Sequence, residues 1–410
     1  MRKALSELKY PNFVIILLLT FPILINSVKV FGNFILLILA LLGAYSFFLK
    51  NKNPFKIPEL TLFSWLTTSY FCVLLLSMLI ADGLDAELHH LGRKIHFLLA
   101  PFVALTLFQV ELSLKRLLLS IKMGLIIIGA IAVTQFLLNL NSDTTLGKVG
   151  MMNANIFGDI AVAMLFLSIV QVFIETPRER IITFIAVFSG IVSITLSSSR
   201  GSWLSLLILS IVYVGLIYRP FLHKNNRRKF FLTLIMSIIF GVIATQTNVS
   251  DRISEAANDV QKWNSGNKSN TSNGLRLQMW EAGLSAAKEA PLFGYGYRNA
   301  NKEASKYVSE NKKTIRNKTH LHNEYITNLV SAGVIGLLML LTLLFKPIII
   351  FYQQLKNKDA YYYSIMGILL CVAYVTFGFT HIAFGEEHMN AFYVFFMALL
   401  LPKVISLKRL

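Results

Sequence analysis

Repeated apolar runs of about 20 residues constrain this chain more than any other feature of its sequence. Twelve such runs can be distinguished between residues 11 and 406. A helix rises 1.5 Å per residue, so a run of that length crosses the hydrocarbon core of a bilayer. Each backbone polar group in that core has to be bonded within the protein, which favours helices. The sequence therefore predicts an all-α polytopic membrane protein.

The predicted spans separate the chain into three parts. Spans 1–9 occupy residues 1–247, a loop domain occupies residues 248–324, and spans 10–12 occupy residues 325–410. The predicted spans are 11–28, 31–49, 61–81, 95–111, 117–140, 152–175, 181–198, 202–218, 230–247, 325–345, 361–383 and 390–406.

Composition supports a membrane protein and argues against other classes. The chain is 55% hydrophobic and 15% charged, whereas soluble domains average about 25% charged residues. Its net charge of +18 is spread over short loops between spans, so we expect no nucleic-acid partner. Cys72 and Cys371 lie within apolar runs and predict no disulfide. No small-residue cleavage site follows the first apolar run, so we expect the first span to be retained.

Basic residues in the short loops predict the orientation. The positive-inside rule places loops rich in Lys and Arg in the cytoplasm. One set of alternate loops carries only Lys29, Arg93, Lys94, Lys148 and Arg200. The other set is strongly basic and includes both termini: Arg2, Lys3, Lys9, Lys50, Lys52, Lys56, Lys115, Arg116, Lys122, Arg178, Arg180, Arg219, Lys224, Arg227, Arg228, Lys229, Lys346, Lys356, Lys358, Lys403, Lys408 and Arg409. We therefore expect cytoplasmic termini, with residues 248–324 on the opposite side.

The long loop domain predicts a small, mostly helical cap over the membrane. Residues 264–274 are polar and rich in turn formers. A helix is expected from Arg276 to Glu289, because apolar residues recur on one face, and Pro291 and the segment 294–296 end it. That apolar face comprises Met279, Trp280, Gly283, Leu284 and Ala287.

The segment from His320 to Tyr325 closes this loop and is the best candidate for chemistry. His320 and His322 are suited to proton transfer near neutral pH. A metal would need further ligands, and Glu324 is the main one nearby, so we expect no metal. In an extended segment the two rings would face opposite sides, leaving one to meet a substrate. Asn323 or Glu324 could orient that ring, or Asn323 could cap the following helix.

Two arginines on the same side are candidates for binding an anion. Arg200 follows Ser199 between two spans, where free N–H groups and hydroxyls would surround the cation. Its alternative role is to reach into water or lipid phosphate at the membrane surface. Arg276 lies near the predicted start of a helix, where its charge opposes the helix dipole unless an anion binds there. Its alternative is a surface or capping role.

Asp159 lies inside the predicted span 152–175. A carboxylate within a membrane span is a functional candidate, although a buried pair with an arginine would explain it equally well. Several residues in other loops on the same side are candidates for binding an acceptor or for supporting roles: His89, His90, His381, Glu386, Glu387 and His388.

These motifs, in this order, resemble the bacterial O-antigen ligases and the related O-antigen polymerases and protein O-oligosaccharyltransferases. The resemblance rests on Ser199-Arg200-Gly201, on Arg276 before Met279-Trp280-Glu281, and on the segment 320–324 with Gly333 and Gly336 in the next span. It covers residues 150–345 by motif and the whole chain by topology and length. The spacing His-x-His-Asn at the start of a span is its most specific element.

The resemblance implies a metal-independent, inverting glycosyltransferase of GT-C-like fold in the bacterial inner membrane, with a periplasmic active site and no cofactor. The donor would be a glycan on undecaprenyl diphosphate, and the acceptor a sugar hydroxyl of lipid A–core. At the matching positions, Arg200 and Arg276 would bind the diphosphate and His322 would be the general base. His320, Asn323, Glu324 and Asp159 would support them.

The alternatives within this superfamily use the same donor. A polymerase differs only in its acceptor, whereas protein O-oligosaccharyltransferases tend to be longer than this chain of 410 residues. A polysaccharide flippase is a more distant alternative, since flippases more often distribute charges along a transmembrane cavity. The sequence therefore favours the ligase.

Overall fold

The computed structural model describes residues 2–28, 30–81, 84–138, 148–149, 152–218, 261, 272–308 and 311–408. The helices are α1 (Arg2–Leu24), α2 (Phe31–Lys50), α3 (Pro58–Ala81), α4 (Leu84–Phe108), α5 (Leu114–Leu137), α6 (Ala154–Ser168), α7 (Pro177–Ser197), α8 (Arg200–Tyr218), α11 (Ser272–Ala287), α12 (Gly296–Ala304), α13 (Lys312–Arg316), α14 (Glu324–Gln354), α15 (Tyr361–Phe377) and α16 (Glu387–Lys408). Short 3₁₀ turns form η2 (Ser305–Tyr307) and η3 (Ala383–Gly385), and a two-residue antiparallel pair joins β1 (Lys148–Val149) to β2 (Met152–Asn153).

The prediction of a helical polytopic membrane protein is confirmed. Within the described residues, α2, α3, α4, α5, α7, α8, α14 and α16 are long and apolar enough to cross a bilayer, a total of eight helices. The shorter apolar helices over Tyr10–Leu24, Ala154–Ser168 and Tyr361–Phe377 coincide with three more predicted spans. The predicted span 230–247 lies outside the described residues.

Two predicted spans continue further than their helices. Helix α6 ends at Ser168, where turns replace the predicted helical residues up to 175. Helix α15 ends at Phe377, and the backbone from Gly378 to Glu386 forms turns and η3 instead of the predicted helix to 383. Both turns contain several apolar residues, and those of the second turn, such as Phe384, are buried, so hydropathy alone does not distinguish them from a span.

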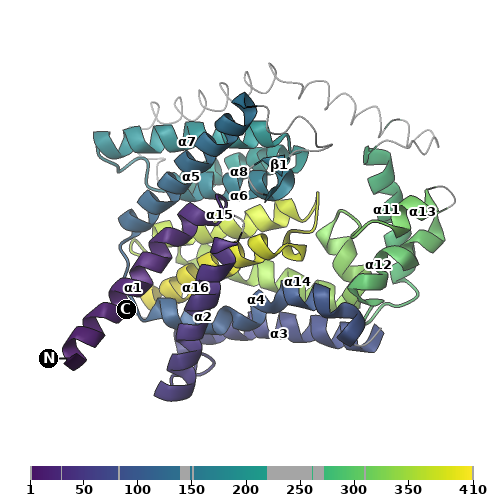
Figure 1. Cartoon of the computed structure of the whole chain (residues 1–410), viewed down its shortest axis with the longest axis horizontal. Helices are drawn as coiled ribbons and strands as arrows, with labels where there is room; N and C mark the ends of the chain where they lie inside the picture. Colours follow the sequence, from purple (N-terminus) through teal and green to yellow (C-terminus); the bar gives the residue numbers. More distant parts are fainter. Residues whose placement is uncertain are drawn as a thin grey trace.

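Helix α16 is the centre of the bundle. It packs against α2, α3 and α4 on one side and against α6 and α15 on the other (Figure 1). The side chains from Met389 to Met397 are fully buried. Such a helix is apolar all round because it meets protein rather than lipid on each face.

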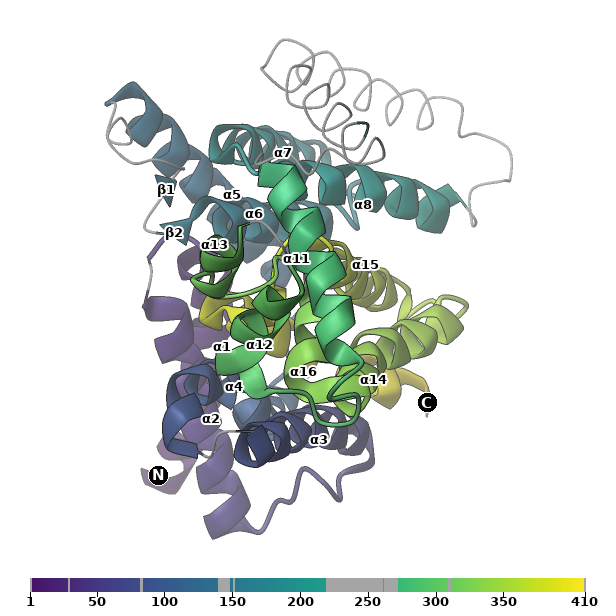
Figure 2. The ribbon, with the colours of Figure 1, turned by 90° about the vertical axis from the view of Figure 1, so that its right-hand side faces the viewer.

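Helices α11, α12 and α13 form a cap at one end of the bundle, as Figure 2 shows with the cap toward the viewer. The cap has its own apolar core, in which Met279, Ala286 and Ile315 are buried. The predicted apolar face is correct for Met279, Gly283 and Ala287, but Leu284 is 49% exposed and lies outside it.

A break in α14 anchors the cap to the bundle. Gly333 has φ +66° and ψ −168°, which interrupts the helix. A side chain there would collide with the carbonyl of Leu292, because the segment before α12 passes against the break. The amide of Val334 donates to Pro291 O at 2.7 Å, and Tyr295 N donates to Val330 O at 2.9 Å. Backbone groups that the break frees are therefore bonded by the cap.

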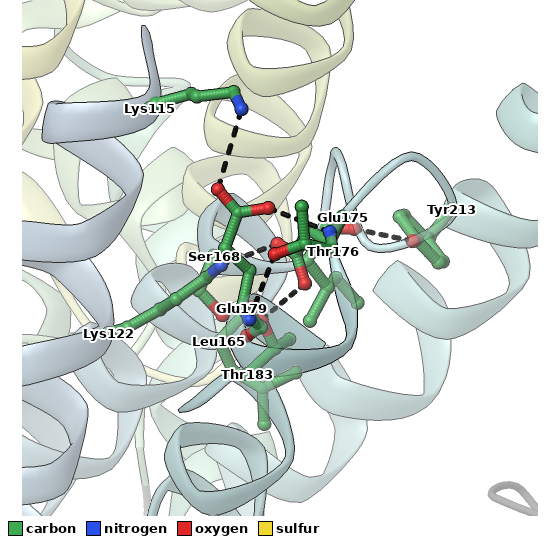
Figure 3. Close-up of polar contacts among 10 residues, drawn as sticks. Lys115, Lys122, Leu165, Ser168, Glu175, Thr176, Glu179, Thr183 and Tyr213 are labelled. Atoms are coloured by element: carbon green, nitrogen blue, oxygen red, sulfur yellow. Dashed lines mark hydrogen bonds and ion pairs between the residues drawn. The ribbon is translucent and has the colours of Figure 1, made fainter. Parts of the chain in front are cut away.

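A buried ion pair lies beside the N-terminal end of α7 (Figure 3). Lys122 Nζ lies 2.5 Å from Glu175 Oε1, with both side chains 6% exposed. Thr183 Oγ1 donates to the second oxygen of Glu175 at 2.6 Å. This pair joins α5 to the start of α7, a full 21-residue helix away from Ser197. The polar groups described next are therefore at the opposite end of α7, on the side of the cap.

Candidate active site

The segment from His320 to Asn323 forms a tight turn between the cap and α14. His322 N donates to Nδ1 of His320 at 3.0 Å, and His322 has φ +54°. The two imidazole rings lie with centroids 4.2 Å apart at 66°. The expectation that they face opposite sides is therefore wrong, because the backbone here is turned rather than extended. Trp280 Nε1 donates to Leu321 O at 3.0 Å and fixes the turn to α11.

Asn323, which ends this turn, and Glu324, which follows it, have structural partners. Asn323 Oδ1 accepts from Ile326 N at 3.0 Å, which confirms that Asn323 caps α14. Glu324 is 2% exposed, and its oxygens accept from Asn328 Nδ2 at 2.7 Å and from Phe384 N at 2.8 Å. Neither Asn323 nor Glu324 therefore uses these bonds to orient the His322 ring.

Both histidines of the turn are held neutral at physiological pH. Burial lowers the pKa of His322 to about 4, and the positive charges of Arg276, Lys318 and His381 contribute to the shift. Burial likewise lowers the pKa of His320 to about 2, with repulsion from His322, His381, Arg276 and Arg93. Nδ1 of His322 is buried and has no hydrogen-bond partner among the described residues. A neutral imidazole with an unpaired ring nitrogen can accept a proton.

Arg276 lies in the second turn of α11, because that helix starts at Ser272 rather than at Arg276. The sequence suggested that the charge of Arg276 lies at the helix N-terminus, and the structure shows that it does not. Burial lowers the pKa of the Arg276 guanidinium, and repulsion from Arg200 adds to the effect. The cap thus places Arg276 within electrostatic range of Arg200, His320 and His322.

Arg200 is the first residue of α8 and is exposed. The hydroxyls beside it are engaged, contrary to the expectation of a free anion-binding corner. Ser199 Oγ donates to Asn155 Oδ1 at 2.9 Å, and Ser202 Oγ donates to Asp159 Oδ1 at 2.7 Å. The serines therefore fix the start of α8, and with it the position of Arg200, to α6.

Asp159 is fully buried and pairs with a histidine rather than with an arginine. Its Oδ2 lies 2.5 Å from Nε2 of His381, in the turn between α15 and α16. The proximity of Asp159 and His381 was not predicted from the sequence, because 222 residues separate them. The one feature of the sequence that points to this pair is the position of His381, in a short polar loop predicted on the same side of the membrane as residues 320–322.

The remaining candidates lie around this centre in two groups. On α4, His89 Nε2 is 3.0 Å from Arg93 Nη2, and the His90 ring stacks on Tyr297 at 6.2 Å. Arg93 Nη1 donates to Gly385 O at 3.3 Å.

The second group lies at the start of α16. Glu387 accepts from Asn33 Nδ2 at 3.4 Å, and Glu386 and His388 flank Glu387 in the sequence.

Lys94 is a buried charge that sequence reasoning missed. It is 2% exposed, donates to Phe384 O at 2.6 Å and its Nζ lies 4.9 Å from the centroid of the Tyr297 ring.

Among the described residues, no group of three or more His, Cys, Asp and Glu side chains could hold a metal ion.

Comparison with known proteins identifies the family. The family described as O-antigen ligase matches residues 184–341, which include Arg200, Arg276 and both histidines of the turn. An uncharacterized protein of Haemophilus influenzae is 31% identical over 382 residues, covering 88% of this chain and 90% of its own length. Together with the helical membrane fold, these similarities show that the chain belongs to the O-antigen ligase family.

Proposed function

We propose that the protein is an O-antigen ligase that transfers a glycan from undecaprenyl diphosphate to a sugar hydroxyl of lipid A–core. The cap end of the bundle would face the periplasm of a bacterial inner membrane, with both termini in the cytoplasm. The observation that carries the proposal is the convergence of three segments: Arg200 from α8, Arg276 from the cap, and His322 from the turn before α14. Family membership narrows the chemistry to lipid-linked glycans.

In this proposal His322 is the general base. The acceptor hydroxyl gives its proton to the ring nitrogen of His322 as the oxygen attacks the anomeric carbon of the donor. The bond between that carbon and the diphosphate oxygen breaks, and the electron pair leaves with the diphosphate, so the configuration is inverted. A histidine with a pKa of about 4 is unprotonated at neutral pH, so its ring is in the form that can accept a proton.

Arg200 and Arg276 stabilise the leaving group. Negative charge grows on the diphosphate as the glycosidic bond breaks, and fixed cations in a poorly hydrated site stabilise that charge. Arginine suits this role because its planar fork can bond two phosphate oxygens at once. The two guanidinium groups repel one another in the free protein, so an anion between them relieves that repulsion.

The banding pattern of lipopolysaccharide from a deletion strain tests the proposal. A ligase deletion leaves core without long chains and accumulates lipid-linked polymer, and the wild-type gene should restore the ladder. A single repeat unit on the core would instead identify a polymerase. An unchanged ladder would reject both activities.

A further inference from the structure

The turn between α15 and α16, residues 378–386, lies between two segments of the proposed site, the start of α14 and the start of α8. On one side, Glu324 N at the start of α14 donates to Gly378 O at 2.8 Å. On the other, a side chain at Gly201 would come within 2.3 Å of Thr380 Oγ1, so α8 begins directly against this turn. The turn therefore connects the segment that carries His322 with the segment that carries Arg200.

His381 lies in this turn and is fixed by buried acceptors. Asp159 Oδ2 lies 2.5 Å from His381 Nε2, and Asp159 Oδ1 accepts from Ser202 Oγ at 2.7 Å. Asp159 and Ser202 are fully buried, and His381 is 6% exposed. The backbone of Ile382 also favours the protonated form of the ring and contributes to raising its pKa. A carboxylate removed from water requires a charged or hydrogen-bonding partner, and His381 supplies one.

We propose that His381, held by Asp159 as an imidazolium, is a positioning residue that supplies a third fixed positive charge for the donor diphosphate. This inference rests on the proposed function and extends it to a residue that the family motifs do not include. In this proposal His381 does not take the acceptor proton, because Asp159 occupies its Nε2 and keeps the ring protonated. It acts on the reaction through charge.

The charges around His381 agree with this assignment. Burial alone would lower the pKa of His381, but the Asp159 charge and hydrogen bond, with a contribution from Glu324, outweigh burial and raise it. His320 and His322 are the titratable groups that face it from the turn before α14, and its positive charge lowers the pKa of both. Asp159 from α6 and Glu324 from α14 are the acids that act on it.

A fixed positive charge at His381 would help the site to bind the negatively charged donor while His322 stays unprotonated. A diphosphate next to His322 would raise the pKa of that histidine and favour its protonated, inactive form. Arg200, Arg276 and His381 oppose that shift, since each repels a proton on His322 directly or neutralises the diphosphate charge. Without His381 we expect a weaker hold on the donor and a higher pKa for His322.

The first test is the pH profile of kcat/KM in purified protein carrying His381→Gln or Asp159→Asn. His381→Gln should move the acidic limb upward, by roughly half a unit to one unit, because His322 loses a neighbouring positive charge. Asp159→Asn removes a negative charge together with the positive charge that it holds on His381, so it should move the limb less. The double variant should resemble Asp159→Asn, since both replace the ion pair by two neutral groups. Lys313→Gln removes one charge from an exposed position of α13 and should leave the limb in place. An unmoved limb in folded His381→Gln protein would overturn the inference.

A binding measurement separates this inference from the proposed function. In a His322→Ala background, which cannot use the base, the affinity for undecaprenyl diphosphate should fall about tenfold when His381→Gln is added, as expected for one lost charge contact of about 1.4 kcal/mol. His381→Arg should recover part of that affinity. Equal affinities with and without His381 would reject the third charge while leaving the His322 base intact. Full transfer by His322→Ala alone would reject the proposed base instead.

Discussion

The carboxylate of Glu324 accepts a hydrogen bond from the backbone N–H of Phe384 at 2.8 Å. The carbonyl of the same Phe384 accepts from Nζ of Lys94 at 2.6 Å. Two buried charges thus bind both backbone groups of one residue in the turn that carries His381. Buried hydrogen bonds to charged groups are strong and costly to break. The geometry of this turn therefore depends on a pair of side chains that do not contact the proposed reacting atoms.

Glu324→Ala should destabilise the protein more than it alters the proposed chemistry per folded molecule. The change leaves the Phe384 N–H without its acceptor and removes one of the two bonds of Asn328 Nδ2, which keeps its bond to the Glu324 carbonyl. Each lost bond to a charged group is worth roughly 1.5–3 kcal/mol. Thermal unfolding in detergent should show a clear drop in Tm, and Glu324→Gln, which keeps one acceptor, should show a smaller one. Glu289→Ala, at an exposed cap position, is the matched control. A Tm equal to that of the control would show that the Glu324 bonds contribute little.

Asn323→Ala should destabilise α14 through the loss of its cap. Replacing an N-cap residue by Ala costs about 0.5–2 kcal/mol, and Asn323→Ser should recover most of it. Transfer activity, normalised to folded protein, should fall far less than in His322→Ala. If Asn323→Ser is folded as well as the wild type but inactive, the amide of Asn323 has a chemical role that its bond to Ile326 does not explain.

The arginines should show the signature of bidentate anion binding. Arg200→Ala and Arg276→Ala should abolish measurable transfer, and Arg→Lys at either position should retain little, since lysine keeps the charge but loses the fork. Arg316→Ala, at an exposed position of α13, is the matched control for loss of a cap arginine. Near-normal transfer by folded, inserted Arg276→Ala would return that residue to a surface role.

The orientation predicts opposite reactivities at the two ends of the bundle. In a background without Cys72, a cysteine at Lys313 in the cap should react with a membrane-impermeant thiol reagent in intact spheroplasts. A cysteine at Lys52, in a loop of the basic set, should react only after lysis. Positions Ser265 and Asn225, which lie outside the described residues, should behave like Lys313 and Lys52 respectively. The reverse pattern would place the histidine turn in the cytoplasm and contradict the proposed reaction.

The sequence predicted the helices well because apolar runs report directly on burial in a bilayer. It also singled out Arg200, Arg276 and His322 as candidates, since polar residues at the ends of apolar spans are conspicuous; their roles stay predictions. It could not predict the ring arrangement of His320 and His322, which depends on the positive φ of His322. The Asp159–His381 pair was equally inaccessible, because it depends on packing between distant helices.

The early end of α15 has a similar origin. Residues 378–384 are apolar enough to continue a span, but Glu324 bonds the carbonyl of Gly378 and the N–H of Phe384 in place of partners in a further helical turn. The break at Gly333 is also imposed from outside the helix, since the backbone of Leu292 occupies the place of a side chain. Local patterns describe a residue's own environment, whereas these features are set by non-local contacts.

The pH dependence and metal dependence of transfer by purified protein test the central claim, that His322 is the general base, most directly. With lipid-linked glycan and core acceptor, kcat/KM should be constant around neutral pH and fall only as the pH approaches the pKa of about 4, where His322 becomes protonated. His322→Ala should lower the rate by about 10²–10⁴ while donor binding persists, and His320→Ala should cost less. EDTA should have no effect. Loss of activity in EDTA with recovery on adding a divalent ion, or a His322→Ala protein as active as the wild type, would contradict the account.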